Sequence, residues 1–92
     1  MGLTKAILNF AAPLPKIEKF DRFLFIGPHP DDIEIGAGAT AAKLIDMGKQ
    51  VRFLICIDGR FGTVNAPEGL SGDKLVEVRR QESLASAAKL GV

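Results

Sequence analysis

The sequence predicts an α/β fold built on a parallel sheet, and three observations lead to this expectation. Two short apolar runs, residues 23–26 and 51–57, have the composition of strands buried on both faces. Residues 33–47 lie between them and carry apolar and small side chains at helical spacing. A second helical segment follows at 73–90. The chain is therefore expected to supply the first strand-helix-strand-helix portion of a Rossmann-like three-layer fold with a mainly parallel sheet.

Glycine and proline mark the ends of the first strand and of the helix that follows it. The run 23–26 stops at Gly27-Pro28, where the chain turns toward His29. Gly48 is expected to end the helix, because glycine readily adopts the left-handed conformation found there. The residues expected on the buried face of this helix are Ile35, Ala39, Ala42 and Ile45.

The second strand and second helix have their own boundary residues. The run 51–57 closes at the turn pair Asp58-Gly59. Residues 60–72 are rich in Gly, Asn and Pro and are expected to form a loop. Asp73 is then expected to cap a helix that Gly91 ends.

Length limits the domain organisation. A chain of 92 residues suits one domain, with residues 1–20 as an amino-terminal arm and 21–92 as the domain portion. Two strands and two helices make an incomplete doubly wound sheet. We therefore expect the sheet to be completed by a missing carboxy-terminal part or by another polypeptide, for example in a homo-oligomer.

Charge and cysteine usage exclude several classes of partner. A net charge of +1, from 12 basic and 11 acidic residues, gives no reason to expect nucleic acid or an anionic membrane surface. No uncharged apolar stretch reaches about 18 residues, so no membrane span is expected. Cys56 cannot form an internal disulfide, and its place in an apolar run predicts a small buried side chain. A poor signal-peptide pattern at the start completes the case for a cytoplasmic protein.

The candidate metal site follows the first strand, where open α/β sheets bind their ligands. His29 and Asp32 stand three residues apart across a strand-to-helix bend, and both are ligand types that suit zinc. Asp31 would point differently and is a candidate to take a proton from a metal-bound water. From residue type alone, a helix cap at Asp31 or Asp32 and a structural His29 explain the pattern equally well.

A longer pattern distinguishes these interpretations. Residues 27–40, GPHPDDIEIGAGAT, resemble the first motif of the LmbE/PIG-L family of zinc N-acetylglucosamine deacetylases. Residues 56–62, CIDGRFG, are similar to that family's second-strand exit. The residues that fit its second helix are Arg79, Glu82, Ala87, Ala88 and Leu90-Gly91-Val92. The resemblance covers about residues 21–92 and leaves the arm outside.

The resemblance implies a metal-dependent hydrolase that removes an N-acetyl group from an acetylated amino sugar or its conjugate. It implies that His29 and Asp32 bind Zn²⁺, with another divalent ion such as Fe²⁺ left open, that Asp31 is the general base and that Arg79 contacts substrate. The family's third ligand is a histidine far downstream, whereas His29 is the only histidine in this sequence. Because a catalytic zinc takes three protein ligands, the chain alone is expected to be inactive.

Two alternative functions stay open. Residues 36–41 satisfy G-x-G-x-x-G/A, and Asp58 ends the second strand about 20 residues later, as in a nucleotide-binding Rossmann oxidoreductase. However, the intervening residues 28–35 place Gly36 and Gly38 inside the helix, where we interpret them as points of close packing. The other alternative is a non-catalytic metal-binding fragment.

Glu34 has two interpretations that the sequence does not separate. It is an acid in the first turn of the expected helix, a position that the helix dipole favours by itself. It is also close enough in sequence to the candidate ligands to orient one of them through a hydrogen bond.

Overall fold

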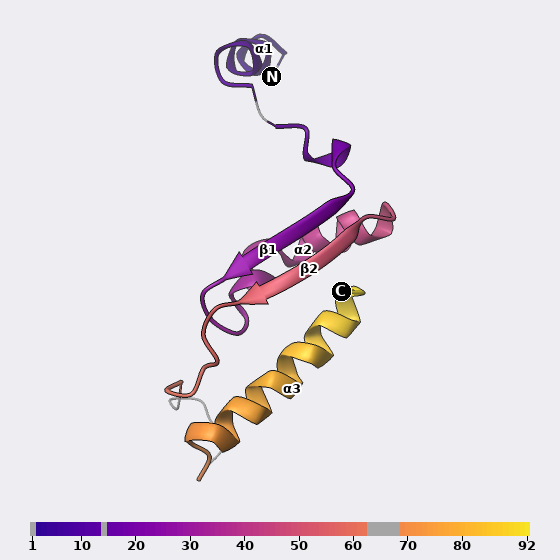
Figure 1. The fold of residues 1–92 in the computed structure, drawn as a ribbon. Coiled ribbons are helices and arrows are strands. Elements are labelled where there is room, and N and C mark those ends of the chain that lie inside the picture. The colour runs from indigo at the N-terminus through magenta and orange to yellow at the C-terminus, as the bar shows by residue number, and fades with distance from the viewer. Residues whose placement is uncertain (1, 14, 63–68) are drawn as a thin grey trace.

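The computed structural model describes residues 2–13, 15–62 and 69–92. Its elements, in chain order, are α1 (Gly2–Ala11), the short 3-10 helix η1 (Ile17–Lys19), β1 (Arg22–Gly27), α2 (Asp32–Asp46), β2 (Gln50–Ile55) and α3 (Gly72–Leu90) (Figure 1). The expected order of strand, helix, strand and helix is confirmed. The sheet of the described residues has two strands, so the three-layer architecture stays a prediction.

The two strands pair in parallel, as the sequence predicts. Arg22 lies opposite Gln50 and Gly27 opposite Ile55. Backbone hydrogen bonding continues past the strand ends, because the Ile57 N–H donates to the Pro28 carbonyl at 2.9 Å. The segments that leave β1 and β2 therefore stay side by side, at the end of the sheet where α/β proteins bind ligands.

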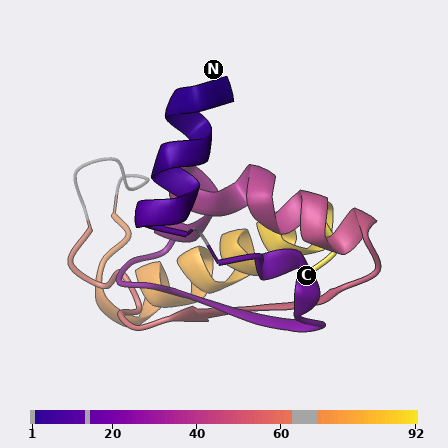
Figure 2. The same cartoon turned by 90° about the horizontal axis from the view of Figure 1, so that it is seen from above.

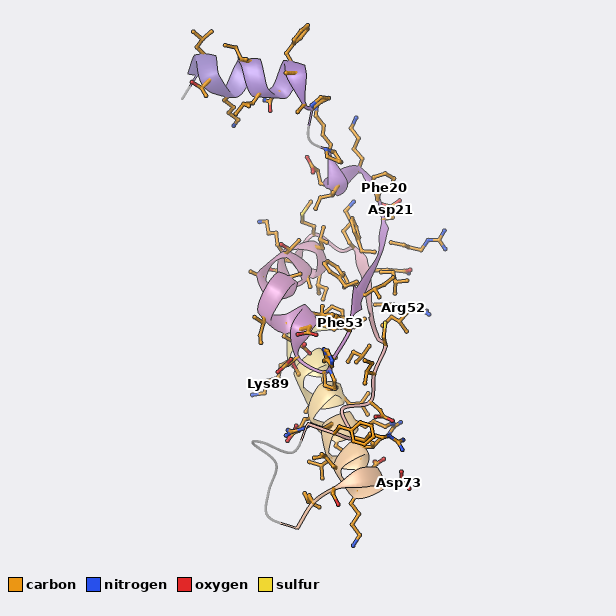
Figure 3. The ribbon with its side chains drawn as sticks, turned by 90° about the vertical axis from the view of Figure 1, so that its left-hand side faces the viewer. Phe20, Asp21, Arg52, Phe53, Asp73 and Lys89 are labelled. Carbon is orange, nitrogen blue, oxygen red and sulfur yellow. The ribbon has the colours of Figure 1, made fainter. Side chains whose placement is uncertain are left out.

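The core lies on one face of the sheet. Val51 of β2 packs with Ala41 and Leu44 of α2, and the rings of Phe25 and Phe53 meet edge to face with centroids 5.8 Å apart. Figure 2 shows α2 and α3 on the same side of the strands. In Figure 3, Phe53 points toward this side, whereas the neighbouring Arg52 points away from the helices.

The strands have the composition of strands covered on both faces, but the incomplete sheet of the described residues is covered on one face only. On the face opposite the helices, Leu24, Ile26 and Leu54 are about half exposed or more. Cys56 is also exposed, contrary to the buried position expected for it. The reason is strand alternation: Cys56 has the same parity as Leu54, and both described helices that cover the sheet lie on the other side.

The rotation of α2 about its axis also differs from the expected one. Its buried residues are Ile33, Ala41 and Leu44, whereas Ile35 is 81% exposed. Ile33 packs against Gly27 so closely that a Cβ at Gly27 would lie 2.6 Å from Ile33 Cγ1, so the face of α2 that meets the sheet carries Ile33. Of the other residues expected on the buried face, Ala39 is exposed, and Ala42 and Ile45 are half-buried.

The interpretation of Gly36 and Gly38 as points of close packing is wrong. A Cβ added at either position would meet nothing within 4 Å, because both lie on the part of α2 that is turned away from its neighbours. The two glycines therefore have no packing partner among the described residues.

The ends of α3 confirm one expectation and correct another. Gly91 ends the helix in the left-handed conformation with φ 87°, and the Val92 N–H donates to the Ala87 carbonyl at 2.9 Å. The N-cap residue is Ser71 and not Asp73, since the helix begins at Gly72. Asp73 lies in the first turn, where its carboxylate is still favoured by the helix dipole. Residues 63–68 of the expected loop 60–72 lie outside the described residues.

The arm contains a helix that the sequence reading did not anticipate. α1 is exposed along its whole length and lies apart from the sheet (Figure 1). Leu3, Ile7 and Phe10 recur at helical spacing, which is the pattern that could have predicted it. No helix in the part of the chain that the structure describes is long and apolar enough to cross a membrane.

The contact between Gly27 and Ile33 leads to a prediction about stability. An added Cβ at Gly27 would lie 2.6 Å from Ile33 Cγ1, and Ile33 is only 5% exposed. We expect Gly27→Ala to lower the free energy of unfolding by about 1–3 kcal/mol, the usual cost of overpacking. Urea unfolding of the intact protein measures the change.

Gly38→Ala is the matched control. It adds the same methyl group inside α2 where nothing lies within 4 Å. Removal of a helical glycine should stabilise by about 0.5–1 kcal/mol. Equal unfolding free energies for the two variants would contradict the packing described at Gly27.

Candidate metal and substrate site

The candidate site lies at the carboxyl end of the two strands. The turn after β1, the start of α2, the exit of β2 and one face of α3 surround a cavity of about 830 Å³. This volume is within the range of about 300–1,000 Å³ typical of small-molecule sites. Four of the residues singled out from the sequence line it: His29, Asp31, Glu34 and Arg79.

His29 and Asp32 come together, as a shared metal requires. Asp32 Oδ2 accepts a hydrogen bond from the His29 backbone N–H at 2.9 Å and lies 3.2 Å from His29 Nδ1. Two ligand atoms about 2.0–2.2 Å from one tetrahedral zinc would be about 3.3–3.6 Å apart. The observed separation is close to this range, so the pair fits two positions of a zinc site.

The pair does not make a complete catalytic site. Within residues 2–13, 15–62 and 69–92, no three His, Cys, Asp or Glu side chains come together in a way that could hold a metal. A catalytic zinc ordinarily has three protein ligands. His29 and Asp32 would account for two of them, and the metal role of both residues stays a prediction.

Asp31 has an unusual backbone conformation. Its φ of 91° is the one positive value at a non-glycine position in the described part of the chain. It occupies the N-cap position of α2, yet its side chain makes no capping hydrogen bond, so the capping explanation fails for Asp31. A left-handed backbone at a non-glycine residue costs about 1–3 kcal/mol. Such strain is concentrated at functional sites.

The Asp32 side chain does not act as a helix cap either. It accepts a hydrogen bond from the backbone N–H of His29, which precedes α2, and not from the first-turn N–H groups of the helix. Both aspartates of the motif therefore have arrangements other than the simple cap that residue type alone allowed.

Arg79 and Glu34 face the cavity from two helices. Arg79 Nη1 donates to Glu82 Oε2 at 2.6 Å, which restrains the guanidinium beside the cavity. Glu34 Oε1 accepts a hydrogen bond from Ser86 Oγ at 3.1 Å, so Glu34 joins α2 to α3. The hydrogen bonds of the described residues do not connect Glu34 to His29 or Asp32. Its proposed support of a metal ligand stays a prediction.

Gly59 is a contact point that the sequence reading treated only as part of a turn. Its φ is 80°, and an added Cβ would lie 3.3 Å from Pro30 Cγ and 3.6 Å from Arg79 Cγ. The exit of β2 therefore lies against Pro30, in the turn of the candidate metal site, and against α3, the helix that carries Arg79.

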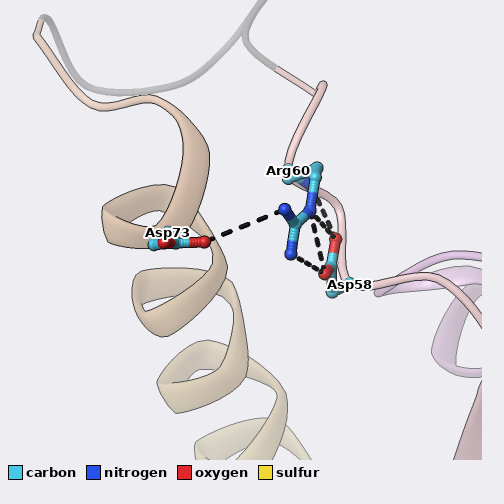
Figure 4. A network of polar contacts seen from close by, with 3 residues as sticks. All are labelled: Asp58, Arg60 and Asp73. Carbon is cyan, nitrogen blue, oxygen red and sulfur yellow. Dashed lines mark hydrogen bonds and ion pairs between the residues drawn. The ribbon is translucent and has the colours of Figure 1, made fainter.

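Arg60 braces this exit loop, a network that sequence reasoning missed (Figure 4). Its Nη2 and Nε donate to Asp58 Oδ2 at 2.8 and 3.1 Å, and its backbone N–H donates to Asp58 Oδ1 at 3.1 Å. Its Nη1 lies 3.8 Å from Asp73 Oδ1 at the start of α3. The hydrogen bonds from Arg60 lower the pKa of Asp58, and Asp58 raises the pKa of Arg60. The Asp-Gly-Arg spacing of residues 58–60 is the sequence pattern that could have predicted the contact between Asp58 and Arg60.

The lowered pKa of Asp58 predicts how the brace depends on pH. A depressed carboxyl pKa means that the contact contributes above the ordinary pKa and is lost as pH falls through the lower, folded value. We expect the Arg60 Nε–H signal in NMR to stay constant from neutral pH to about pH 5 and to change only below about pH 4. Asp58→Asn should alter it already at pH 7. A midpoint above the ordinary aspartate pKa of about 4 would contradict this assignment.

The nucleotide-binding alternative finds no support in this geometry. Its fingerprint needs glycines in the tight turn directly after the strand, where the pyrophosphate meets a helix N-terminus. Gly36 and Gly38 instead lie inside α2, which begins at Asp32. The Asp58 carboxylate, the candidate ribose ligand, is engaged by Arg60.

Comparison with known proteins agrees with the family resemblance found in the sequence. The family model PIG-L, described as GlcNAc-PI de-N-acetylase, matches residues 24–92. A diacetylchitobiose deacetylase of Thermococcus kodakarensis is 39% identical over 90 residues, which are 98% of this chain and 32% of that protein. A 1D-myo-inositol 2-acetamido-2-deoxy-alpha-D-glucopyranoside deacetylase of Nocardioides sp. is 41% identical over 76 residues, 77% of this chain and 25% of that protein.

The matches also show how much of each relative this chain covers and how far along the chain the similarity reaches. The chain spans about a third or less of the length of the relatives it matches. The family model begins at residue 24, so the arm lies outside it as expected, whereas the match to the Thermococcus kodakarensis protein also extends into residues 1–20. No solved structure gives a significant match.

Proposed function

We propose, because the chain belongs to the PIG-L family, that it carries the metal-binding turn and part of the substrate site of a metal-dependent N-deacetylase. Its substrate would be an acetylated amino sugar or a conjugate of one, the type of compound in the names of its relatives. The observation that carries the proposal is the His29–Asp32 pair beside a cavity that Asp31 and Arg79 also line.

His29 and Asp32 would hold the metal ion. Nitrogen and carboxylate oxygen donors suit Zn²⁺, and Fe²⁺ is the alternative. Such an ion, when bound, polarises the acetamide carbonyl and lowers the pKa of a coordinated water to about 7. The third protein ligand would come from sequence outside this chain.

Asp31 would act as the general base and then as the general acid. Its carboxylate lines the cavity and has no hydrogen-bond partner among the described side chains, so it is available to take the proton of the attacking water. The same carboxyl group would then return a proton to the leaving nitrogen, without which the amine is a poor leaving group.

Arg79 would position the sugar. Its guanidinium carries five N–H donors, and Glu82 accepts from Nη1, so other donors stay available for sugar hydroxyl groups. Its side chain is 24% exposed, which is compatible with contact from within the cavity. Arg79 would therefore contribute to substrate binding more than to the chemical step.

Acetate release tests the proposal. The proposal concerns the protein with its third metal ligand in place, which we call the intact protein. When it is incubated with diacetylchitobiose or N-acetylglucosamine, it should release acetate and free amine in equal amounts. A chelator should stop the release and added Zn²⁺ or Fe²⁺ should restore it. Metal uptake without acetate release from any N-acetylated sugar would instead favour a non-catalytic metal-binding protein.

A further inference from the structure

Phe61 is a large exposed aromatic side chain on the wall of the candidate site. It is 88% exposed and lines the same cavity as His29 and Asp31. A single exposed apolar side chain needs no explanation by itself. Two further observations indicate a role for Phe61: its position on the cavity wall and the turn that holds its backbone.

The loop that presents Phe61 is fixed on both sides. Arg60, the preceding residue, binds Asp58 through two guanidinium nitrogens. The Gly62 N–H donates to the Gly59 carbonyl at 2.9 Å and closes a turn with Arg60 and Phe61 at its two central positions. The backbone that carries Phe61 is thus held beside the cavity, although the ring itself buries little surface in the fold.

The lining of the cavity is divided between polar and apolar groups. Arg79, Glu82, Ser83 and Ser86 of α3 form a polar wall, whereas Phe61 and Ile57 of the β2 exit are apolar. A pyranose ring has a similar division, with hydroxyl groups around its rim and apolar C–H groups on its faces. Aromatic side chains offer a flat apolar surface that such a face can cover.

We propose that Phe61 is a specificity-determining residue, a platform on which the sugar ring of the substrate stacks while its hydroxyl groups meet the polar wall of α3. This inference rests on the proposed function and deepens it. It predicts that the protein distinguishes a pyranose from an acyclic N-acetyl compound, which has the same reacting group but no ring face.

Steady-state kinetics of the intact protein with two substrates tests the platform. Phe61→Ala should raise the KM for N-acetylglucosamine about tenfold, since stacked aromatic contacts contribute on that scale, and should leave kcat nearly unchanged. The KM for N-acetylethanolamine should not change. Phe61→Tyr should keep the wild-type values. Phe10→Ala is the matched control, because Phe10 is 92% exposed on α1.

Two results would overturn the platform: an unchanged KM for N-acetylglucosamine in Phe61→Ala, or an equal loss with both substrates. A thermal midpoint equal to that of the wild type checks that the variant is folded. If the wild type releases no acetate, the proposed function fails, and NMR-detected binding of N-acetylglucosamine still decides about Phe61. A Kd about tenfold weaker in Phe61→Ala would then support the platform, and an unchanged Kd would overturn it.

Discussion

Asp31→Asn in the intact protein is expected to reduce acetate release by about 10²–10⁴-fold, the usual contribution of a general base. Asparagine keeps the size of the side chain and tolerates positive φ nearly as well as aspartate, so the turn around φ 91° should persist. The amide cannot take a proton from water at neutral pH. The loss should therefore be in kcat, with bound metal and KM close to wild type.

Asp31→Gly separates the chemical role of Asp31 from its backbone strain. Glycine adopts positive φ freely, so this variant should be as inactive as Asp31→Asn while the strained conformation costs less. Its thermal midpoint should be equal to or above that of the wild type. Near wild-type kcat in Asp31→Asn would remove Asp31 from the proton transfer and leave its left-handed conformation without a functional explanation.

His29→Ala is expected to abolish stoichiometric metal binding. It removes one of the two protein ligands that this chain offers, and the loss of even an outer hydrogen-bond partner of a ligand commonly costs about 10–100-fold in affinity. The loss for a direct ligand should exceed this range, and acetate release should disappear with the metal. Metal titration followed by calorimetry, with a competing chelator for tight binding, measures the change.

Asp21→Asn is the control for a change in side-chain charge far from the candidate metal site. Asp21 is 91% exposed at the opposite end of β1 and pairs with Lys49 at 3.3 Å. Its removal should leave metal affinity unchanged. Equal metal binding by wild type and His29→Ala would show that the ion binds elsewhere in the protein.

The elements that the sequence predicted well are those fixed by local chemistry. Gly27-Pro28 ends β1, Gly91 ends α3 in the left-handed conformation, and the two apolar runs pair in parallel. The convergence of His29 and Asp32 followed from their spacing across one short turn. The turns and the helix end depend on residues that are close in sequence, whereas the parallel pairing of β1 with β2 followed from the order strand, helix, strand.

The features that the sequence missed depend on contacts between different elements of the fold. Ile33, on the buried face of α2, lies against Gly27 of β1, whereas the periodicity of small residues alone favoured the face of Ile35. The contact of Gly59 with Pro30 and Arg79 joins three segments. No pattern within any one segment predicts which pairs meet.

The strands show how far composition predicts burial. Apolar composition indicates that a strand can be covered on both faces, but not which polypeptide covers it. Leu24, Ile26 and Leu54 have the composition of a covered face and are exposed in the described residues. The same argument explains Cys56, whose position depends on strand parity as well as on its apolar neighbours.

The metal content of Asp31→Asn and Asp32→Asn, purified side by side in the intact protein, tests the central assignment most directly. We expect about one ion per chain in the wild type and in Asp31→Asn, and little or none in Asp32→Asn, because a catalytic zinc depends on each of its few protein ligands. Both variants should be inactive, so metal content and not activity separates the two roles. Retention of the ion by Asp32→Asn together with its loss from Asp31→Asn would contradict the account and exchange the ligand and the base.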